Sequence, residues 1–196
     1  MRIITAKLEG TTPYSQSRKY DHTCPKKDKE SAADYDLRTW RERCTTNDDG
    51  IVCIPGMAIK MALDATAKKL KEKVPGKGAK TWIDYVIGGV VPSDLMFPIG
   101  VSKDKVDFID IWANADGVRG SGKRVMRRFP IIKKWSCTIS LDVLDNSLPA
   151  DLIERYLGEA GLIVGIGRFR PEKGGMNGRF RVKSVKWSEM DMAEAA

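Results

Sequence analysis

Several short stretches of the chain alternate hydrophobic and polar residues, which is the two-residue period of a strand with one buried face. The period appears in residues 3–10 and is strictest in residues 135–143, where one face holds Trp135, Cys137, Ile139, Leu141 and Val143. Residues 50–55 and 179–187 predict two further strands, and the last changes phase between Val182 and Val185. Such a change of phase indicates a bulge or the end of the strand.

Two other stretches show the 3.6-residue period of an amphipathic helix. Residues 57–73 place Ile59, Leu63, Thr66 and Leu70 on one face, and residues 149–161 do the same with Leu152, Ile153, Tyr156, Leu157 and Ala160. A shorter helix is expected within residues 31–44, with Tyr35, Leu37, Trp40 and Cys44 toward the core. The second long helix should end by Gly161, where glycines begin.

The remaining segments lack a clear period or are strand-like only in composition. Residues 11–29 are polar and contain two prolines, so they are expected to form a loop. Residues 82–92, 93–101 and 106–114 have the composition of strands. Residues 115–135 are basic and begin with interleaved glycines, which predicts a flexible loop.

The order of these elements predicts an α+β fold. A ferredoxin-like β-α-β-β-α-β arrangement, with an antiparallel sheet and helices on one face, accommodates it. A chain of 196 residues forms one such domain over its whole length. Two departures from the simple arrangement are expected, an insertion or loop at residues 11–45 and an insertion with extra strands and a basic loop at residues 76–134.

The amino-acid composition indicates that the protein binds an acidic partner. Lys and Arg outnumber Asp and Glu by 34 − 26 = +8, and the isoelectric point is near 9.3. Such a balance favours a polyanion. No apolar run reaches the roughly 20 residues that cross a bilayer, and residues 1–10 lack a signal core, so we expect a cytoplasmic protein without membrane contact.

The sequence offers little for catalysis or for a cofactor. Its four cysteines are irregularly spaced and never form a CxxC pair, which favours free thiols over a zinc site with His22. His22 is the single histidine, and no phosphate-loop or nucleophile-elbow motif occurs. We therefore expect no metal, no cofactor and no catalytic residue.

Glycines and bases are interleaved near the end of the chain, in residues 161–182. Glycine allows positive φ and close approach of another chain, while guanidinium groups fork onto phosphate oxygens. The segment therefore predicts a loop that holds a phosphate backbone, although a glycine-rich turn with solvated arginines remains open. Its candidate binding residues are Gly165, Gly167, Arg168, Arg170, Lys173, Gly174, Gly175 and Arg179.

Two further sets of bases join the candidate interface. Lys60 falls in the first turn of a predicted helix, where backbone N–H groups already favour an anion. The basic segment between the middle strands has no acid after Asp116, and repulsion among its charges favours a polyanionic partner over a solvated loop. Its candidate binding residues are Arg119, Lys123, Arg124, Arg127 and Arg128.

Two of these stretches resemble motifs of the RAMP superfamily, the repeat-associated subunits of CRISPR effector complexes. Residues 52–70, VCIPGMAIKMALDATAKKL, resemble the IPG-x-x-x-K start of the family's first helix, and residues 158–182 resemble its glycine-rich loop. The resemblance implies a modified RNA-recognition-motif fold whose copies line a guide RNA. It also implies RNA-backbone contacts for Lys60, for residues 55–57 and for the glycine loop. Met57 and Ala58 depart from the family's usual small polar pair, and the loop is longer and more basic.

Three functions follow from the pattern and the resemblance. The first is non-catalytic binding of single-stranded RNA, with assembly into an oligomer or an effector complex of antiviral defence. The second is a virus-encoded relative that binds single-stranded DNA or mimics a CRISPR subunit to inhibit it. The third is a processing endoribonuclease using His22, and a target-cutting subunit would instead use one early acid, Asp21, Asp34, Asp36, Asp48 or Asp49.

Overall fold

A four-stranded antiparallel sheet is the centre of the molecule in this computed structural model, which describes residues 1–20, 23–114, 122 and 124–189. Its order is β4-β8-β1-β9, and the bounds are β1 Arg2–Gly10, β4 Val90–Pro92, β8 Ser136–Val143 and β9 Phe180–Glu189. Every neighbouring pair is antiparallel. With the helices between them, these strands give the ferredoxin-like β-α-β-β-α-β order, so the predicted α+β fold class is confirmed.

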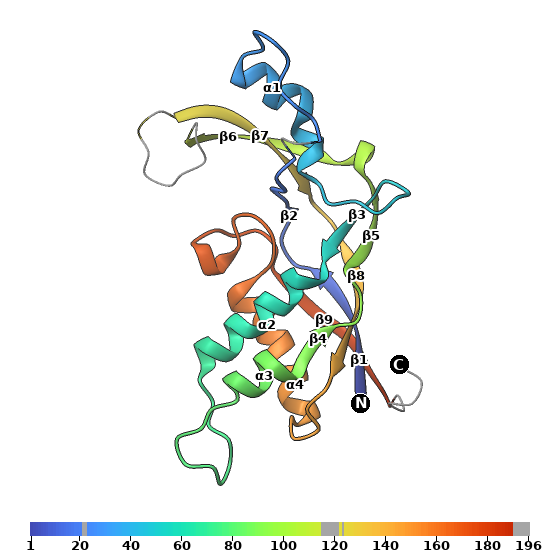
Figure 1. Ribbon diagram of the computed structural model, residues 1–196, viewed down its shortest axis with the longest axis vertical. Coiled ribbons are helices and arrows are strands. Elements are labelled where there is room, and N and C mark those ends of the chain that lie inside the picture. The colour runs from blue at the N-terminus through green and yellow to red at the C-terminus, as the bar shows by residue number, and fades with distance from the viewer. Residues whose placement is uncertain (21–22, 115–121, 123, 190–196) are drawn as a thin grey trace.

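Two long helices cover one face of this sheet. They are α2, Gly56–Leu70, and α4, Ala150–Glu159, with the shorter α3, Ile83–Gly89, beside α2 (Figure 1). Ile4, Ala6 and Leu8 of β1 are fully buried against this layer, as their alternation predicts. From the helices, the same core receives Ile59, Leu63, Ile153, Tyr156 and Leu157. The bulge predicted in β9 is present, because the register shifts opposite Lys7 and Leu8.

A second group of elements extends from one end of the sheet (Figure 1). Strands β6, Asp107–Asn114, and β7, Arg124–Ile132, form a two-stranded arm, and the base of β7 also pairs with β2, Tyr14–Ser15. Helix α1, Ala32–Thr39, and a 3₁₀ turn, Trp40–Arg43, pack against β7. A separate pair joins β3, Ile51–Pro55, to β5, Met96–Ser102.

Three local predictions were wrong. Residues 83–89 form helix α3 instead of a strand, because Val86 and Gly89 lie one helical turn apart on its buried side. The basic residues 124–132 form strand β7 instead of a flexible loop, because eight residues of β6 pair with them. Helix α4 does not stop at Gly161 but continues as a π-helical turn, Ala160–Val164.

Two smaller findings concern the predicted insertions. Leu37 is exposed on α1, whereas Trp40 and Cys44 are buried as expected. Strand β4, which falls within residues 76–134, is an edge strand of the central sheet. The catalytic candidates Asp21 and His22 lie outside the described residues.

Candidate nucleic-acid interface

The glycine-rich loop leaves the π-helical turn and folds back on the start of the chain. Its backbone hydrogen bonds run from Arg168 N to Ser15 O (2.8 Å), from Gly178 N to Pro13 O (2.7 Å) and within the loop from Ile166 N to Gly178 O (3.0 Å). A short 3₁₀ turn, Pro171–Lys173, forms its tip. The loop is therefore fastened to the protein along most of its length.

The glycines permit this folding. Gly165, Gly167 and Gly174 have positive φ, and a Cβ on Gly167 would lie 2.4 Å from the Ser15 carbonyl oxygen. A Cβ on Gly175 would meet the backbone of Phe169, whereas the corresponding position on Gly174 is open. The close approaches in this loop are thus to the protein's own backbone, which the sequence does not distinguish from an approach to phosphate.

The two stretches that resemble RAMP motifs meet at one cavity of about 310 Å³. From the first stretch come Pro55 and Ala58, at the start of α2, and from the second come Gly167 and Arg168. The rest of the lining comes from the N-terminal third of the chain: Tyr14, Gln16, Ser17, Arg18 and Thr45. Tertiary structure therefore joins segments that are about a hundred residues apart.

The start of α2 contributes a positive dipole end to this cavity. Pro55 occupies the N-cap position without a side-chain hydrogen bond to the helix, and the first turn holds no acid. The N–H of Gly56 donates to Leu95 O (2.8 Å), and the following N–H groups of the first turn, which have no side-chain cap, favour an anion. The same end of the helix therefore adds to the charge of Arg168.

Arg168 is the most unusual base of the loop. Its guanidinium carbon lies 3.7 Å from the ring centre of Phe129 and 4.4 Å from that of Phe169, and Nη1 donates to Ser17 Oγ (3.1 Å). Burial lowers its pKa to about 10, with a further contribution from the nearby charges of Arg43 and Arg127. Among the described residues, no acid forms an ion pair with it, and its Nε is buried without a hydrogen-bond partner.

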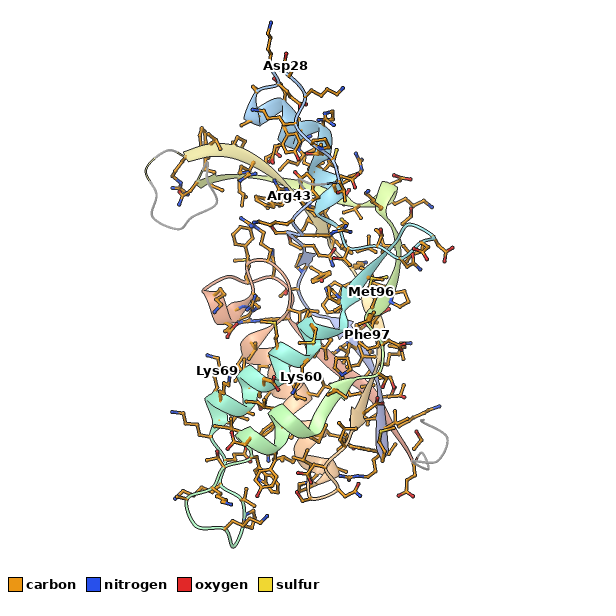
Figure 2. The ribbon with its side chains drawn as sticks, viewed as in Figure 1. Asp28, Arg43, Lys60, Lys69, Met96 and Phe97 are labelled. Carbon is orange, nitrogen blue, oxygen red and sulfur yellow. The ribbon has the colours of Figure 1, made fainter. Side chains whose placement is uncertain are left out.

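Behind Arg168 lies a buried charged cluster that the sequence does not reveal. Arg43, labelled in Figure 2, is only 6% exposed. Its guanidinium carbon lies 4.7 Å from the ring centre of Phe129, and it pairs with Asp36. Asp36 also accepts from Arg127 Nη2 (3.1 Å) and from the backbone N of Arg128 (3.0 Å). One carboxylate therefore serves two guanidinium groups, and Arg168 adds a third positive charge nearby.

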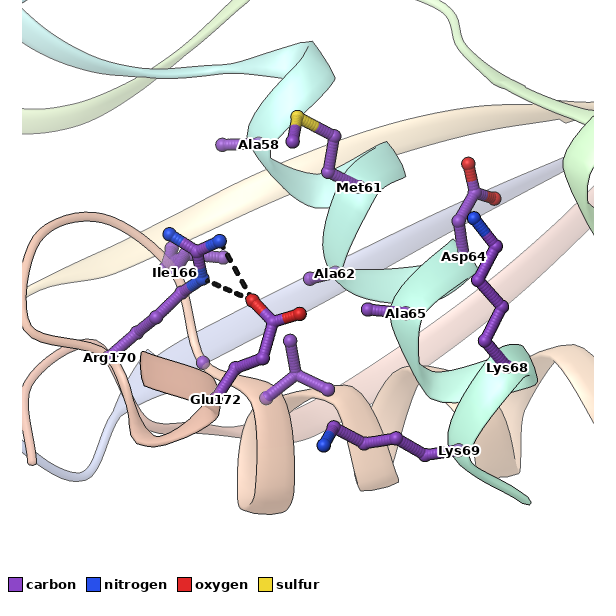
Figure 3. A pocket seen from close by; sticks show the side chains of 12 residues that line it. Ala58, Met61, Ala62, Asp64, Ala65, Lys68, Lys69, Ile166, Arg170 and Glu172 are labelled. Carbon is purple, nitrogen blue, oxygen red and sulfur yellow. Dashed lines mark hydrogen bonds and ion pairs between the residues drawn. The ribbon is translucent and has the colours of Figure 1, made fainter. Parts of the chain in front are cut away.

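A second depression lies along α2 and shares the lining residue Ala58 with this cavity. It measures about 400 Å³ and has an apolar floor that includes Ala58, Met61, Ala65 and Ile166 (Figure 3). Charged side chains form its rim, namely Asp64, Lys68, Lys69, Arg170 and Glu172. We call the cavity and this depression together the loop–helix groove.

Lys60 departs from the expectation that it meets an anion. Its ammonium group donates to Asp64 Oδ1 (2.6 Å), to Val86 O (3.0 Å) and to Ile87 O (2.8 Å), and the residue is 7% exposed. Three protein acceptors match the three donors of an ammonium group. The structure therefore gives Lys60 a role in fixing α3 to α2, and it contributes nothing to the loop–helix groove.

The other candidate bases are divided between paired and exposed positions. Arg170 is held by Glu172 and by the Gly167 carbonyl, and Arg128 is bound by Asp110. The exposed bases are Arg179, Arg124 at the far end of β7, and Lys173, whose ammonium group lies 3.8 Å from a Glu172 oxygen. Arg119 and Lys123 lie outside the described residues.

The face of the central sheet opposite the helices is polar. It presents Thr5, Lys7 and their neighbours on β8 and β9, including Ser136, Thr138, Ser140, Ser184 and Lys186. Within the described part of these strands, both aromatic residues, Phe180 and Trp187, pack on the helix side. In RNA-recognition motifs, bases stack on aromatic rings of the sheet surface. The described part of this sheet face has no aromatic ring for that purpose.

Other types of site have little support in the described residues. No group of three or more His, Cys, Asp or Glu residues there is arranged to hold a metal ion. All four cysteines are free, and burial raises the pKa of Cys44 and Cys137 to about 12. In the same ranges, no helix has both the length and the apolarity needed to cross a membrane.

Comparison with known proteins gives only distant similarities. No protein-family model matches the sequence, and no curated protein matches it. Among solved structures, Cmr6 from Pyrococcus furiosus is 15% identical with a TM-score of 0.47, over 93% of this chain and 99% of that one. A chain in the type III-B Cmr-beta complex bound to cognate target RNA is 12% identical with a TM-score of 0.46, over 96% of this chain and 61% of that one. Because both TM-scores are below 0.5, we infer neither family nor partner from them.

Proposed function

We propose that this protein binds single-stranded RNA without cutting it, as one subunit of an oligomer or of a CRISPR-type effector complex. One observation carries the proposal: the two stretches that resemble RAMP motifs converge on a cavity that contains a helix start and Arg168. Arg168 brings a positive charge to that cavity without an acidic partner among the described residues. A phosphate group supplies the missing negative charge.

The loop–helix groove offers a continuous path for such a strand. A phosphate binds at Arg168 and the start of α2, while the apolar floor at Met61 and Ala65 accepts a ribose or base. Lys173 and Arg179 are exposed on the same loop and neutralise neighbouring phosphates. Glycines set the shape of the loop, and arginine supplies its charge.

Binding of single-stranded DNA by a virus-encoded relative is the alternative with the same chemistry. Contacts made to phosphates do not separate the two sugars. Parallel titrations with RNA and DNA strands of one sequence decide between them. A clear preference for DNA would move the alternative to first place.

A salt titration tests the proposal itself. The logarithm of the affinity should fall linearly with the logarithm of salt, with a slope near −0.7 per phosphate neutralised. Arg168→Gln should make the slope shallower by about 0.7. Arg155→Gln is the matched control, because Arg155 is exposed on α4 and paired with Glu72, and its slope should equal that of wild type. The proposal is contradicted if the protein does not bind RNA at low salt, or if its affinity for RNA does not change with salt concentration.

A further inference from the structure

The arm formed by β6 and β7 has one face on which aromatic and basic side chains gather. Directly opposed residues of an antiparallel pair share a face. The register opposes Asp110 to Arg128, Trp112 to Met126 and Asn114 to Arg124, with Phe108 farther down the same side. We define the arm face by Phe108, Asp110, Trp112, Arg124, Met126 and Arg128.

Exposure sets Trp112 apart from every other tryptophan. It is 59% exposed, whereas Trp40, Trp82 and Trp135 are buried and Trp187 is half-buried. Phe108 and Met126, its neighbours on the arm face, are also exposed. Phe108 contacts the buried Trp40 (5.6 Å between ring centres), whereas Trp112 has no such ring contact among the described residues, so its side chain is available to a ligand.

The charges on the arm face favour a nucleic acid over an apolar protein surface. Arg128 lies 3.6 Å from the ring centre of Phe108 and forks onto both Asp110 oxygens, so the face's acid is neutralised internally. Arg124 remains, and its Nη2 donates to the backbone carbonyl of Trp112 (3.0 Å). The net charge beside the open tryptophan is therefore positive.

The ring of Trp112 is also open to stacking. Within the ranges that the structure describes, neither an aromatic ring nor a guanidinium group stacks on it. Tryptophan beside arginine provides a flat surface for a base and a cation for the next phosphate. Since the sheet surface offers no ring, base stacking has to come from another part of the molecule.

We propose that Trp112 is a base-stacking residue, so that the arm face receives an unpaired nucleobase while Arg124 meets an adjacent phosphate. The inference rests on the proposed function, because the loop–helix groove must hold the same strand. It adds stacking on a base to an interface that meets phosphates at Arg168 and a ribose or base at its apolar floor. Stacking is stronger for purines, so adenine-rich strands bind more tightly than uracil-rich strands of equal length.

Tryptophan emission and strand affinity, measured on the same samples, test the proposal. The probes are oligoadenylate RNA and an abasic strand of equal length, each added to wild type, Trp112→Phe, Trp112→Ala and the control Trp187→Phe. Oligoadenylate should quench the emission of wild type and of Trp187→Phe, and Trp112→Phe should lose the quenching while keeping most of its affinity. Trp112→Ala should weaken oligoadenylate binding by roughly 5- to 150-fold and leave abasic-strand binding unchanged.

The possible failures are distinguishable. If wild type binds both strands with equal affinity and unchanged emission, Trp112 stacks on no base and the proposal is overturned, while the proposed function stands. If neither strand binds, both are overturned. If emission shifts to the blue with protein concentration alone and oligoadenylate causes no quenching, a second copy covers the arm face and stacking on bases is excluded.

Discussion

At the scale of single residues, partner acids divide the bases into two groups with different roles. Lys60, Arg128 and Arg170 are each bound by a carboxylate, which compensates their charge within the protein. Arg168 is held by two aromatic rings and a serine hydroxyl instead. Because all four carry the same formal charge, the sequence does not distinguish them. Only their surroundings separate the bases whose charge is compensated within the protein from Arg168, which we propose binds the ligand.

Glycine substitutions test which role the loop's glycines have. Gly167→Ala should lower the free energy of unfolding by about 2–4 kcal/mol, because it adds a clash with the Ser15 carbonyl to the cost of positive φ. Gly174→Ala, with the same sign of φ and open space around it, should cost only about 1 kcal/mol. Urea denaturation of both variants gives the comparison. Equal losses in the free energy of unfolding for the two variants would show that the close approach to Ser15 does not determine the cost of the substitution.

Replacing Lys60 should affect stability and leave the salt dependence of RNA binding unchanged. Lys60→Met leaves Asp64 and two carbonyls without their donor, at a cost of about 2–3 kcal/mol. Adding Asp64→Leu should recover part of that loss, because the unpaired charge is then removed. Melting curves and salt titrations on both variants check this. A shallower salt slope in Lys60→Met would place Lys60 back in the interface.

At the scale of elements, one acid joins the arm to α1 and to the 3₁₀ turn. Asp36 of α1 binds Arg43, the side chain of Arg127 and the backbone N of Arg128, so α1, the 3₁₀ turn and β7 meet at a single carboxylate. Strand β7 also pairs with β2, and the Ser15 carbonyl of β2 accepts a hydrogen bond from Arg168 N in the glycine loop. The position of the arm face relative to the loop–helix groove therefore depends on this junction.

Neutralising Asp36 should loosen that junction. Asp36→Asn leaves Arg43 buried without a counter-charge, which should cost about 3–5 kcal/mol and speed amide exchange in α1 and β7 before β1. Asp107→Asn is the control on the same arm, because its pair with Lys133 is exposed and its loss should stay within about 0.5 kcal/mol. Hydrogen exchange by mass spectrometry resolves the segments. Equal acceleration of amide exchange in α1, β7 and β1 would contradict a junction that opens independently of the central sheet.

At the scale of the whole molecule, the two surfaces that we propose bind one strand are the loop–helix groove and the arm face. The loop–helix groove lies on the helix side of the sheet, and the arm projects beyond it (Figure 1). A strand that contacts both follows the long dimension of the molecule. Neighbouring copies on a longer strand would then be brought close together.

This arrangement predicts cooperative binding along RNA. When neighbours touch, each added copy binds more tightly, so the number of copies should grow with strand length. Native mass spectrometry on strands of roughly 10, 20 and 40 nucleotides measures the stoichiometry directly. One stoichiometry for all three lengths would indicate a stand-alone binder.

The sequence by itself determined the elements whose periodicity is unambiguous. Ile4, Ala6 and Leu8 specify β1, Ile59 and Leu63 specify one face of α2, and the phase change after Val182 specifies the bulge in β9. These patterns are local, because a strand or helix must turn its apolar side to the core whatever else the chain does. For that reason the α+β class and most strands could be predicted.

Only the tertiary structure decided the partners of the charges. Lys60 is the fifth residue of α2, just beyond the first turn in which the sequence placed it, and its ammonium group is occupied by α3, a segment that the composition of residues 83–89 placed in a strand. Arg43 is inconspicuous in the sequence, and Asp36 stands out there only as one of five early acids, yet their ion pair joins α1 and the 3₁₀ turn beside the arm. Arg168 is left without an acid in an ion pair, among the described residues, at the meeting point of two distant motifs. Ion pairs form between residues that folding brings together, so their energies depend on distances of a few ångströms that no spacing along the chain encodes.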